Sequence, residues 1–293
     1  MSWLQLETII GQQRPETLEP VLEELGATAV WFRDAGEEPI LEPKPGETPL
    51  WSATIVAALF PEDTDPEMLA AALQDVVEGS ELSFTRIDER DWQADWQKTL
   101  RPLRFGDRLW VVPDGIAFNK PGIGVRMTPG LAFGTGEHPT TAMCLNWLES
   151  QPLSGCSVLD YGCGSGLLAI ASLALGADEA CAVDIDAQAL AATRNNAEKN
   201  SCSEKLVVCC PEEIAAGRQY DVLVANILSG TLIELGPVIS KLLHSNARLA
   251  LSGILEDQAE AVCAAWSDWA ALKTSMQDQN WVLLTGRKHG IEG

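Results

Sequence analysis

The chain has 293 residues, of which 46% are hydrophobic and 21% charged, with 42 acidic side chains against 20 lysines and arginines. The net charge of −22 opposes direct binding to nucleic acids and favours cationic partners, although an acidic surface can also serve solubility alone. No apolar run reaches the length of a membrane span and no secretory leader is recognisable, so we expect a cytoplasmic protein that binds no membrane.

The eight cysteines and three histidines are scattered along the sequence, without a CxxC pair or another spacing typical of metal ligands. Cysteines within apolar segments are mostly small buried side chains. We therefore predict neither a metal site nor a disulfide framework.

Residues 1–90 predict a small domain in which strands and helices alternate. Strands are expected at residues 3–10, 28–33, 51–59 and 81–87, and helices at 15–25 and 65–77. The order β-α-β-β-α-β is typical of a ferredoxin-like α+β domain. Seventeen of the acidic side chains lie within residues 1–82, and no catalytic residue types cluster there. We therefore interpret residues 1–90 as a substrate-recognition domain.

A short helix is expected at residues 91–100, with Trp92 and Trp96 one turn apart and Pro102 ending it. We interpret residues 91–104 as a helical linker and the two tryptophans as packing residues between domains. Short strands at 109–113 and 123–127 then lead into a second domain, residues 105–293.

Residues 129–141 form a segment rich in glycine and proline before a helix expected at 142–148. Such a loop can close over a ligand, while Thr140 or Thr141 could instead cap the helix. Glu137 and His138 are candidate bases, but we favour a role in positioning the loop. Phe133 either packs on a cofactor or substrate or is an ordinary packing residue.

The stretch 158–167 gives the strongest signal, because an apolar strand ends at Asp160 and glycines follow at 162, 164 and 166. A helix at 167–175 comes next, and this arrangement brings backbone N–H groups close to a ligand. Leu167 takes the place of the third glycine of a GxGxxG fingerprint, which disfavours a nicotinamide cofactor. The stretch resembles the first motif of Rossmann-like, class I S-adenosylmethionine-dependent methyltransferases. The alternative is a plain strand-to-helix turn.

Strands and helices go on alternating after this motif, which predicts an α/β, doubly wound, Rossmann-like sheet. Further strands are expected at 180–183, 206–210, 220–225, 248–251 and 281–285, and helices at 187–200, 232–243 and 256–266. Ligands of such sheets bind at the carboxyl ends of the strands, where Gly162, Asp184 and Asn226 fall. Asp184 lies about 20 residues beyond the glycines, where a carboxylate can accept hydrogen bonds from ribose hydroxyls.

Six segments together resemble the PrmA family of ribosomal protein L-eleven methyltransferases: 91–97, 101–113, 129–141, 160–171, 183–186 and 226–228. The resemblance covers residues 91–293 and extends to residues 1–90 only in the order of elements. It implies that Thr141, Gly162, Asp184 and Asn226 bind S-adenosylmethionine. It also implies that residues 1–90 grip the basic ribosomal protein, whose lysine side chains and N-terminal amine accept methyl groups.

The chemistry of amine methylation singles out Asn226 as the candidate catalytic residue. A lysine with a pKa of about 10.4 is neutral in roughly one molecule in a few thousand at pH 7, and only the neutral amine can attack. The Asn226 amide oxygen can hold amine N–H groups without a charge, whereas a carboxylate would stabilise the ammonium ion. The alternative role for Asn226 is a cap after a strand.

Two other functions stay open. One is N-methylation of another protein or of a small metabolite, and the other is S-adenosylmethionine binding without catalysis. The separate acidic domain favours a basic macromolecule over a metabolite, and the presence of both Asn226 and the glycine-rich loop at 129–141 favours catalysis.

Overall fold

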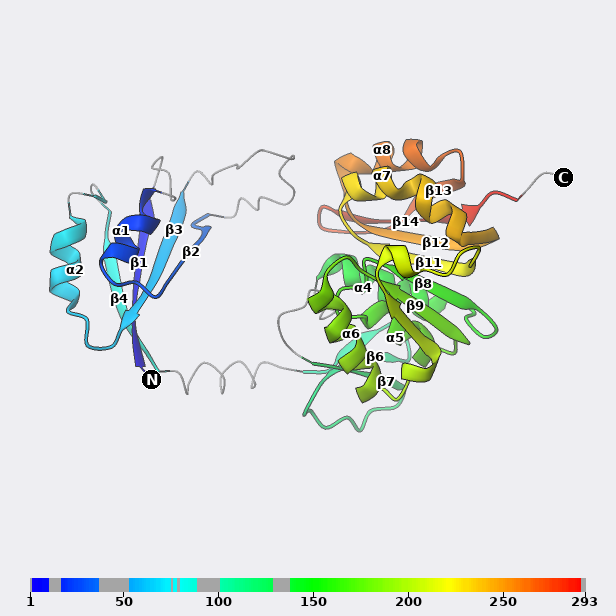
Figure 1. The fold of residues 1–293 in the computed structure, drawn as a ribbon, viewed down its shortest axis with the longest axis horizontal. Helices are drawn as coiled ribbons and strands as arrows, with labels where there is room; N and C mark the ends of the chain where they lie inside the picture. Colours follow the sequence, from blue (N-terminus) through cyan, green and yellow to red (C-terminus); the bar gives the residue numbers. More distant parts are fainter. Residues whose placement is uncertain are drawn as a thin grey trace. The chain divides into compact units, whose positions relative to one another are not determined.

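The computed structural model describes residues 2–10, 17–36, 53–74, 76–77, 80–88, 101–128 and 138–290. The chain divides into two compact units, Met1–Thr99 and Leu100–Gly293 (Figure 1). The linker helix predicted at 91–100 lies outside the described residues, and so do Trp92 and Trp96. Residues 129–137 of the glycine-rich loop also lie outside them.

The first unit is a four-stranded antiparallel sheet with the strand order β2-β3-β1-β4. Its elements follow one another as β1 (Ser2–Ile10), α1 (Glu19–Glu24), β2 (Ala29–Asp34), β3 (Thr54–Pro61), α2 (Pro66–Leu73) and β4 (Leu82–Asp88). This is the ferredoxin-like arrangement that the element order predicts, so that prediction is confirmed.

Alternate side chains of β1 build the core of this unit, because successive side chains of a strand point to opposite faces. Leu4, Leu6 and Ile10 are buried and pack in one cluster with Leu22 of α1 and Leu69 of α2. The first unit therefore has a hydrophobic core of its own.

The second unit is built on a seven-stranded sheet with the order β10-β9-β8-β11-β12-β14-β13. Its strands are β8 (Ser157–Tyr161), β9 (Glu179–Val183), β10 (Leu206–Cys209), β11 (Tyr220–Asn226), β12 (Leu243–Leu255), β13 (Ala270–Asp278) and β14 (Trp281–Lys288). The strands β8 to β12 run parallel, so their carboxyl ends meet at one edge. After β8 the chain forms β9 on one side of β8, and it later forms β11 on the other side of β8. This reversal makes the topological switch point at which such sheets bind ligands.

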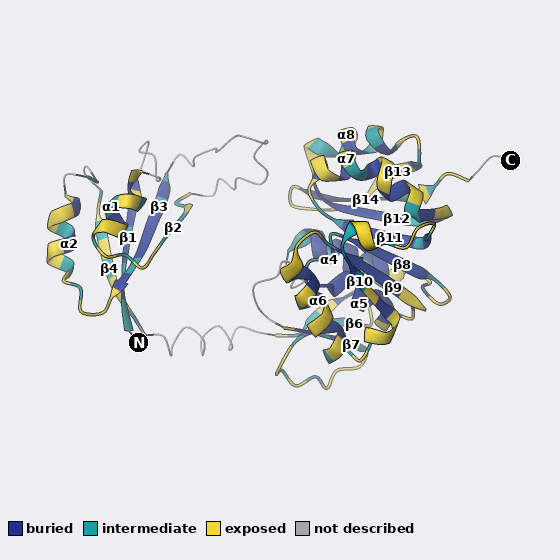
Figure 2. Cartoon of the chain, viewed as in Figure 1, coloured by how far each residue is buried: buried dark blue, intermediate teal, exposed yellow. Residues whose placement is uncertain are grey.

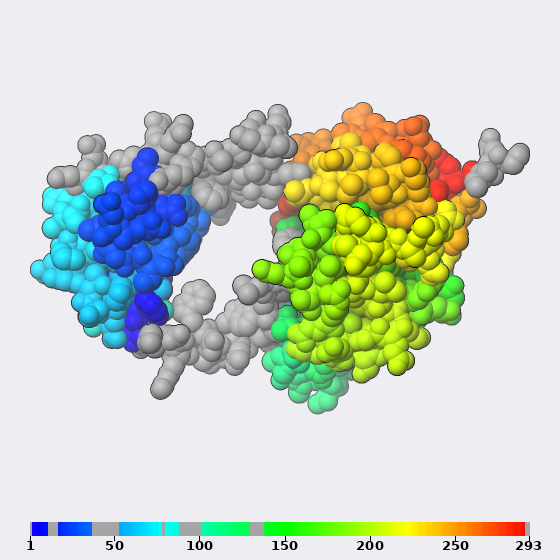
Figure 3. Space-filling model, in the orientation of Figure 1, coloured from blue at the N-terminus to red at the C-terminus, as the bar shows by residue number. Residues whose placement is uncertain are grey.

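Helices cover both faces of this sheet (Figures 1 and 2). On one side α4 (Pro139–Ser150), α5 (Leu167–Ala174) and α6 (Ala187–Lys199) pack in a row, and on the other α7 (Ser229–Ile239) packs against α8 (Ala259–Trp266). Short 3-10 helices lie at Ser203–Lys205, Pro211–Glu213, Ser240–Leu242 and Glu256–Gln258. In the space-filling view the residues coloured green to orange form one continuous surface (Figure 3). The predicted doubly wound α/β sheet is confirmed.

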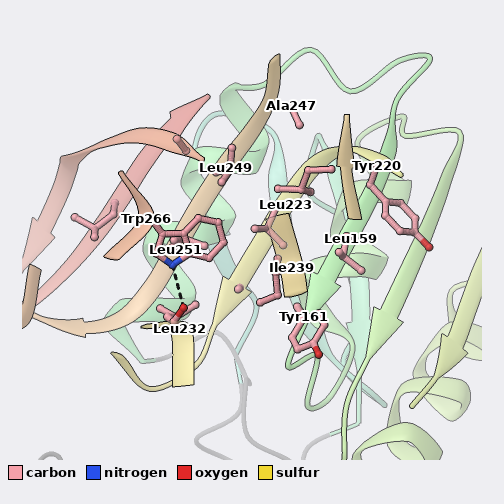
Figure 4. Packing of buried hydrophobic residues seen from close by; sticks show 14 of the residues in the cluster. Leu159, Tyr161, Tyr220, Leu223, Leu232, Ile239, Ala247, Leu249, Leu251 and Trp266 are labelled. Carbon is pink, nitrogen blue, oxygen red and sulfur yellow. Dashed lines mark hydrogen bonds between the residues drawn. The ribbon is translucent and has the colours of Figure 1, made fainter. Parts of the chain in front are cut away.

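Large apolar side chains fill the space between the sheet and the helices α7 and α8 (Figure 4). Leu249 and Leu251 of β12 cluster with Trp266 of α8, which is fully buried. The indole Nε1 of Trp266 donates a hydrogen bond of 3.0 Å to the backbone oxygen of Leu232 in α7. This bond satisfies the one polar atom of the indole and joins the two helices.

A smaller sheet precedes the large one and consists of β5 (Leu103–Phe105), β6 (Leu109–Pro113) and β7 (Ile123–Met127). β6 pairs antiparallel with β5 and parallel with β7. Both α5 and α6 contact β7. β7 therefore packs the small sheet against these two helices.

The last part of the second unit departs from the prediction. The helix expected at 232–243 ends at Ile239, and β12 covers Leu243–Leu255 where only 248–251 is predicted. The sequence pattern also predicts no strand at Ala270–Asp278, because the exposed residues Lys273 to Ser275 give it little apolar character. The predicted alternation is therefore wrong after α8, where β13 and β14 form an antiparallel hairpin.

Among the described residues, no helix combines the length and the apolar composition needed to cross a lipid bilayer. No three His, Cys, Asp or Glu side chains within the same ranges converge as metal ligands would. All eight cysteines are free, and four of them are buried in the second unit: Cys144, Cys163, Cys181 and Cys209.

Candidate functional site

The glycine loop after β8 has a backbone that suits only glycine. Gly162, Gly164 and Gly166 have left-handed φ angles of 79°, 52° and 77°. A Cβ on Gly162 would overlap the Cγ2 atom of Ile227, and a Cβ on Gly166 would lie 2.6 Å from Cγ2 of Thr193. The loop thus needs glycine both for its backbone angles and for its close approach to neighbouring segments.

Hydrogen bonds from several elements hold this loop. The N–H groups of Gly162 and Cys163 donate to the backbone oxygen of Val183, at 2.8 and 3.0 Å. The hydroxyl of Thr193 in α6 donates to the backbone oxygen of Gly164 at 3.0 Å. The loop is therefore tied to the end of β9 and to α6 by the protein itself.

Asp184, predicted to hold ribose hydroxyls, directly follows β9 and is half-buried. Its Oδ2 accepts the N–H of Gly164 at 2.9 Å, and its Oδ1 accepts the N–H of Asp186 at 3.0 Å. Each carboxylate oxygen keeps a further lone pair for a ligand hydroxyl. The structure places Asp184 against the glycine loop and gives it a role that its spacing did not predict, which is to order that loop.

Asp160, the last acidic residue before the glycines, is fully buried. Its Oδ2 accepts the N–H of Ala169 at 2.9 Å, whereas its Oδ1 has no hydrogen-bond partner among the described residues. Burial raises the pKa of Asp160 to about 7; the Ala169 bond opposes this rise and the charge of Asp184 adds to it. A buried oxygen in this state favours a hydrogen-bond donor or a cation supplied by a ligand.

Thr141 and Asn226 lie far apart in the sequence but meet in the structure. Asn226 ends β11, and its Nδ2 donates a hydrogen bond of 3.1 Å to Oγ1 of Thr141 in the first turn of α4. Thr141 is buried and Asn226 is half-buried. The amide oxygen of Asn226 makes no hydrogen bond within the described ranges. The pair therefore presents an uncharged acceptor at the end of β11.

His138, and not a threonine, caps α4. Its Nδ1 accepts the N–H of Thr140 at 3.4 Å and lies 2.7 Å from the Thr140 hydroxyl. The imidazole also packs edge-on against Trp281, with ring centroids 5.2 Å apart. Burial lowers the pKa of His138, so the ring is neutral at pH 7 and can accept. The alternative in which Thr140 or Thr141 caps the helix is wrong, while Phe133 and Glu137 lie outside the described residues.

Ile227 and Gly253 complete the site, and the sequence pattern does not single them out. The N–H of Ile227 donates to the backbone oxygen of Ser252 at 3.2 Å. Gly253 has a φ of 80°, and a Cβ there would overlap the backbone oxygen of Ile227. An isolated glycine within an apolar strand often marks such a close approach, so the glycine in the run 249–254 was the available signal.

The four predicted positions converge on one edge of the sheet. Asp184 bonds the glycine loop, Gly162 abuts the residue after Asn226, and Asn226 bonds Thr141. This edge offers carboxylate oxygens for hydroxyls or a cation and a neutral oxygen for an amine. Together these groups can bind a polar, positively charged ligand beside a nucleophile.

The chain is similar over its full length to one protein family. A family model described as "Ribosomal protein L11 methyltransferase (PrmA)" matches residues 2–289. The match includes the first unit, for which the sequence motifs supplied only the order of elements.

Two relatives illustrate the similarity. The chain is 46% identical over 290 residues to the ribosomal protein L11 methyltransferase of Hahella chejuensis, with 98% of this chain and 99% of the relative covered. It is 47% identical over 293 residues to the protein of the same name from Pseudomonas savastanoi pv. phaseolicola, with 98% and 100% covered.

A solved structure supports the fold. The ribosomal protein L11 methylase from Lactobacillus delbrueckii subsp. bulgaricus superposes with a TM-score of 0.56 at 24% identity, covering 64% of this chain and 97% of that one. At this level of identity the similarity concerns the fold alone.

Proposed function

This chain belongs to the family of ribosomal protein L11 methyltransferases (PrmA), and from that membership we propose that it methylates ribosomal protein L11 with S-adenosylmethionine as methyl donor. The proposed acceptors are lysine side chains and the N-terminal amine of this basic protein. The observation that carries the proposal is the Asn226–Thr141 hydrogen bond beside the glycine loop, because it leaves an uncharged acceptor at the strand ends.

The residues of the site fit S-adenosylmethionine. The left-handed glycines let the backbone approach a ligand closely, and Gly162 lies at the switch point of the sheet. Asp184 has lone pairs to accept ribose hydroxyls, and the Oδ1 of Asp160, which has no partner in the described part of the chain, suits a donor group or a positive charge. We assign Thr141, Gly162, Asp184 and Asn226 to cofactor binding.

When bound, S-adenosylmethionine supplies a methyl group that its sulfonium centre already activates. The protein therefore has to bring a neutral amine into line with it. We propose that Oδ1 of Asn226 accepts an N–H of the incoming amine and orients the nitrogen lone pair. Because the amide is uncharged, it does not favour the ammonium form as a carboxylate would.

Thr141 supports this role by orienting the amide. Its Oγ1 accepts from Nδ2 of Asn226, so the nitrogen end of the amide is engaged and the oxygen end is the one available to the amine. Burial of Thr141 in α4, which His138 caps, fixes this hydroxyl in place. Thr141 thus acts as a positioning residue for Asn226 in addition to its contact with the cofactor.

We further propose a division of labour along the chain. Residues 1–90 recognise the basic substrate protein, residues 91–104 form a helical linker, and residues 105–293 carry out the transfer. The separate core of the first unit and its excess of acidic side chains support this assignment. The proposed location is the cytoplasm, where ribosomal proteins are made, and we propose no direct contact with nucleic acid or membrane for the catalytic reaction.

Intact-mass analysis tests the proposed function. Purified ribosomal protein L11 is incubated with the enzyme and S-adenosylmethionine, and its mass should rise by whole methyl increments. Fragmentation should then place the increments on lysines or the N-terminal amine. A matched reaction with Asn226→Ala enzyme controls for contaminating activity.

A panel of other proteins and amine metabolites decides between the proposal and its alternatives. Methylation of a panel member in preference to ribosomal protein L11 would support a different N-methyltransferase. Binding of S-adenosylmethionine without transfer to any amine would support a non-catalytic module.

A further inference from the structure

A groove of about 330 Å³ lies in the second unit, away from the glycine loop. Trp147 and Gln151 line it from α4 and the residue after it, and Arg248, Lys273, Thr285 and Arg287 line it from β12, β13 and β14. Within β12, Ser252 pairs with Asn226 at the carboxyl end of the sheet, whereas Arg248 pairs with Val222 four residues earlier. The groove therefore opens at the end of the sheet opposite to the glycine loop.

Strand register puts the cations of the groove next to one another. In the antiparallel pair of β12 and β14, Arg248 lies directly opposite Arg287, and in that of β13 and β14, Lys273 lies opposite Thr285. Residues paired across strands project from the same face of a sheet. Like charges directly opposite each other destabilise a sheet unless another charge compensates them.

The two arginines are already held in place. Arg248 donates to Oε1 of Gln151 at 3.2 Å, to the backbone oxygen of Pro152 at 2.9 Å and to Sγ of Cys156 at 3.2 Å. Nη1 of Arg287 donates to the backbone oxygen of Asn246 at 3.2 Å. These partners are neutral, so they orient the guanidinium groups without cancelling their charge.

None of the described residues that line the groove is a carboxylate, although the protein has 42 acidic side chains and only 20 lysines and arginines. Within the described ranges, Arg248, Lys273 and Arg287 form no ion pair, and Lys273 has no hydrogen-bond partner. The carboxylate of Asp221 is not part of the groove: burial opposes the lowering of its pKa, which comes mainly from the N–H and hydroxyl of Ser157, and the charge of Arg248 adds only a smaller contribution. Three positively charged side chains thus lie together in a protein whose surface is expected to be mainly acidic.

We propose that this groove binds a phosphate group, carried either by inorganic phosphate or by an RNA strand. Phosphate offers several strong acceptor oxygens and up to two negative charges, which match two oriented guanidinium groups, an ammonium group and the Thr285 hydroxyl. A single carboxylate would compensate only one of the three charges, whereas inorganic phosphate supplies up to two and an RNA strand supplies one with each of its successive phosphodiester groups. The site is separate from the proposed methyl transfer and does not depend on it.

Calorimetric titration of the full-length protein tests the proposal, with inorganic phosphate in one arm and a short single-stranded RNA in the other. The variants are Arg287→Gln and Lys273→Gln. The matched control is Lys205→Gln, which removes the same charge from an exposed lysine next to β10, at the other edge of the sheet. Wild type and control should bind at least one probe saturably, and each groove variant should bind it about tenfold more weakly or worse.

The two arms separate the sources of the phosphate. Binding of inorganic phosphate alone identifies a small anion as the ligand. RNA binding that weakens steeply with salt identifies a polynucleotide. Failure of both probes to bind wild type would overturn the proposal, and so would equal binding by the groove variants and the control.

Thermal unfolding shows whether a variant that fails to bind is nevertheless folded. Without either probe, Arg287→Gln should unfold at a temperature close to that of wild type, because the loss of the hydrogen bond to Asn246 is offset by removal of the repulsion with Arg248. Whichever probe binds, inorganic phosphate or RNA, should raise the melting temperature of wild type and of Lys205→Gln but not of Arg287→Gln. A rise of equal size in Arg287→Gln would contradict the site.

Discussion

Single polar side chains of the site use only part of their hydrogen-bonding capacity within the protein. Each carboxylate oxygen of Asp184 accepts one backbone N–H group, and Nδ2 of Asn226 donates to Thr141. We assign the remaining lone pairs of the Asp184 carboxylate to S-adenosylmethionine and the amide oxygen of Asn226 to the acceptor amine. Substitutions here should therefore affect binding and transfer to different degrees.

Asp184→Ala should weaken binding of S-adenosylmethionine by roughly 10- to 150-fold. The variant loses hydrogen bonds to a charged acceptor, worth about 1.5–3 kcal/mol, and also frees the Gly164 N–H that orders the loop. Calorimetric titration measures the dissociation constant, with circular dichroism as the control for folding. An unchanged constant in a folded variant would refute the assignment.

Asn226→Ala should lower the rate of methyl transfer more than it lowers affinity for S-adenosylmethionine. The contact with the amine tightens toward the transition state, while contacts with the bound cofactor are present throughout. Single-turnover kinetics gives the transfer rate, and Thr141→Val should reproduce part of the loss because it releases Nδ2 of Asn226. Wild-type transfer rates in folded Asn226→Ala enzyme would exclude this role.

Asp160 predicts a pH dependence of stability. Burial raises its pKa from 3.8 to about 7, so between these values the folded protein holds a proton that the unfolded chain releases. The stability linked to this proton is present at low pH and is lost as the pH rises through 7. Asp160→Asn cannot ionise, so its unfolding free energy relative to wild type should increase by about 4 kcal/mol from pH 4 to pH 8.

Urea denaturation without cofactor at a series of pH values measures this difference. The comparison with wild type removes the contribution of the other acidic groups, which both proteins share. A difference that stays constant across the range would mean that Asp160 is not the group that titrates.

At the scale of elements, α6 links the small sheet to the glycine loop. Asn196 of α6 donates from Nδ2 to the backbone oxygen of Ser165 at 2.9 Å, and its Oδ1 accepts the N–H and hydroxyl of Thr128, at 3.0 and 2.9 Å. One turn later, Asn200 bonds both backbone groups of Arg126 in β7. The helix thus supplies β7 with the side-chain partners that a further strand would otherwise provide.

Asn196→Ala should lower the free energy of unfolding by about 2–3 kcal/mol, because it removes three hydrogen bonds at a buried position. Asn196→Asp keeps the acceptor for Thr128 but replaces the donor to Ser165 with a carboxylate oxygen in a buried position, so it should be at least as destabilising as Asn196→Ala if the bond to Ser165 matters. Urea denaturation of both variants gives the comparison. Stability of Asn196→Ala within 0.5 kcal/mol of wild type, roughly the range of neutral surface substitutions, would mean that the link contributes nothing.

Sequence patterns predict best the elements that are buried. β8, β9 and β11 are continuous apolar runs between turn residues, and their predicted and observed bounds nearly coincide. β13 carries exposed polar residues on an edge strand, so it lacks the apolar pattern that identifies a strand in the sequence, although its hairpin pairing with β14 is local.

The site follows the same rule. The strand-end positions of Gly162, Asp184 and Asn226 follow from the alternation of elements, and the family resemblance adds Thr141. The burial of Asp160 and the bonds of Asn196 depend on which segments pack together, so spacing alone could not predict them.

At the scale of the whole molecule, each of the two compact units has its own sheet and buried residues. A fragment that starts near Asp91 should therefore keep its affinity for S-adenosylmethionine. It should lose most of its efficiency toward ribosomal protein L11, because it lacks the acidic first unit that we propose recognises the substrate. If recognition is electrostatic, full-length activity at limiting substrate should also fall with salt, since the screening length is only about 8 Å at physiological ionic strength.

Circular dichroism and cofactor titration must first establish that the fragment is folded. The catalytic efficiency of the fragment toward ribosomal protein L11 then tests whether residues 1–90 recognise the substrate. A folded fragment as efficient as the full-length enzyme would show that residues 1–90 are not the recognition domain.

The glycines around Ile227 restrict the mutational paths open to this enzyme. At position 162 a new side chain would meet the side chain of Ile227, so a smaller residue at 227 would relieve the crowding and leave only the backbone strain. At position 253 the obstacle is the backbone of Ile227, which every residue shares. During evolution, Gly162 could therefore be replaced only after Ile227 had been replaced by a smaller residue. No substitution at position 227 would make room for a side chain at position 253.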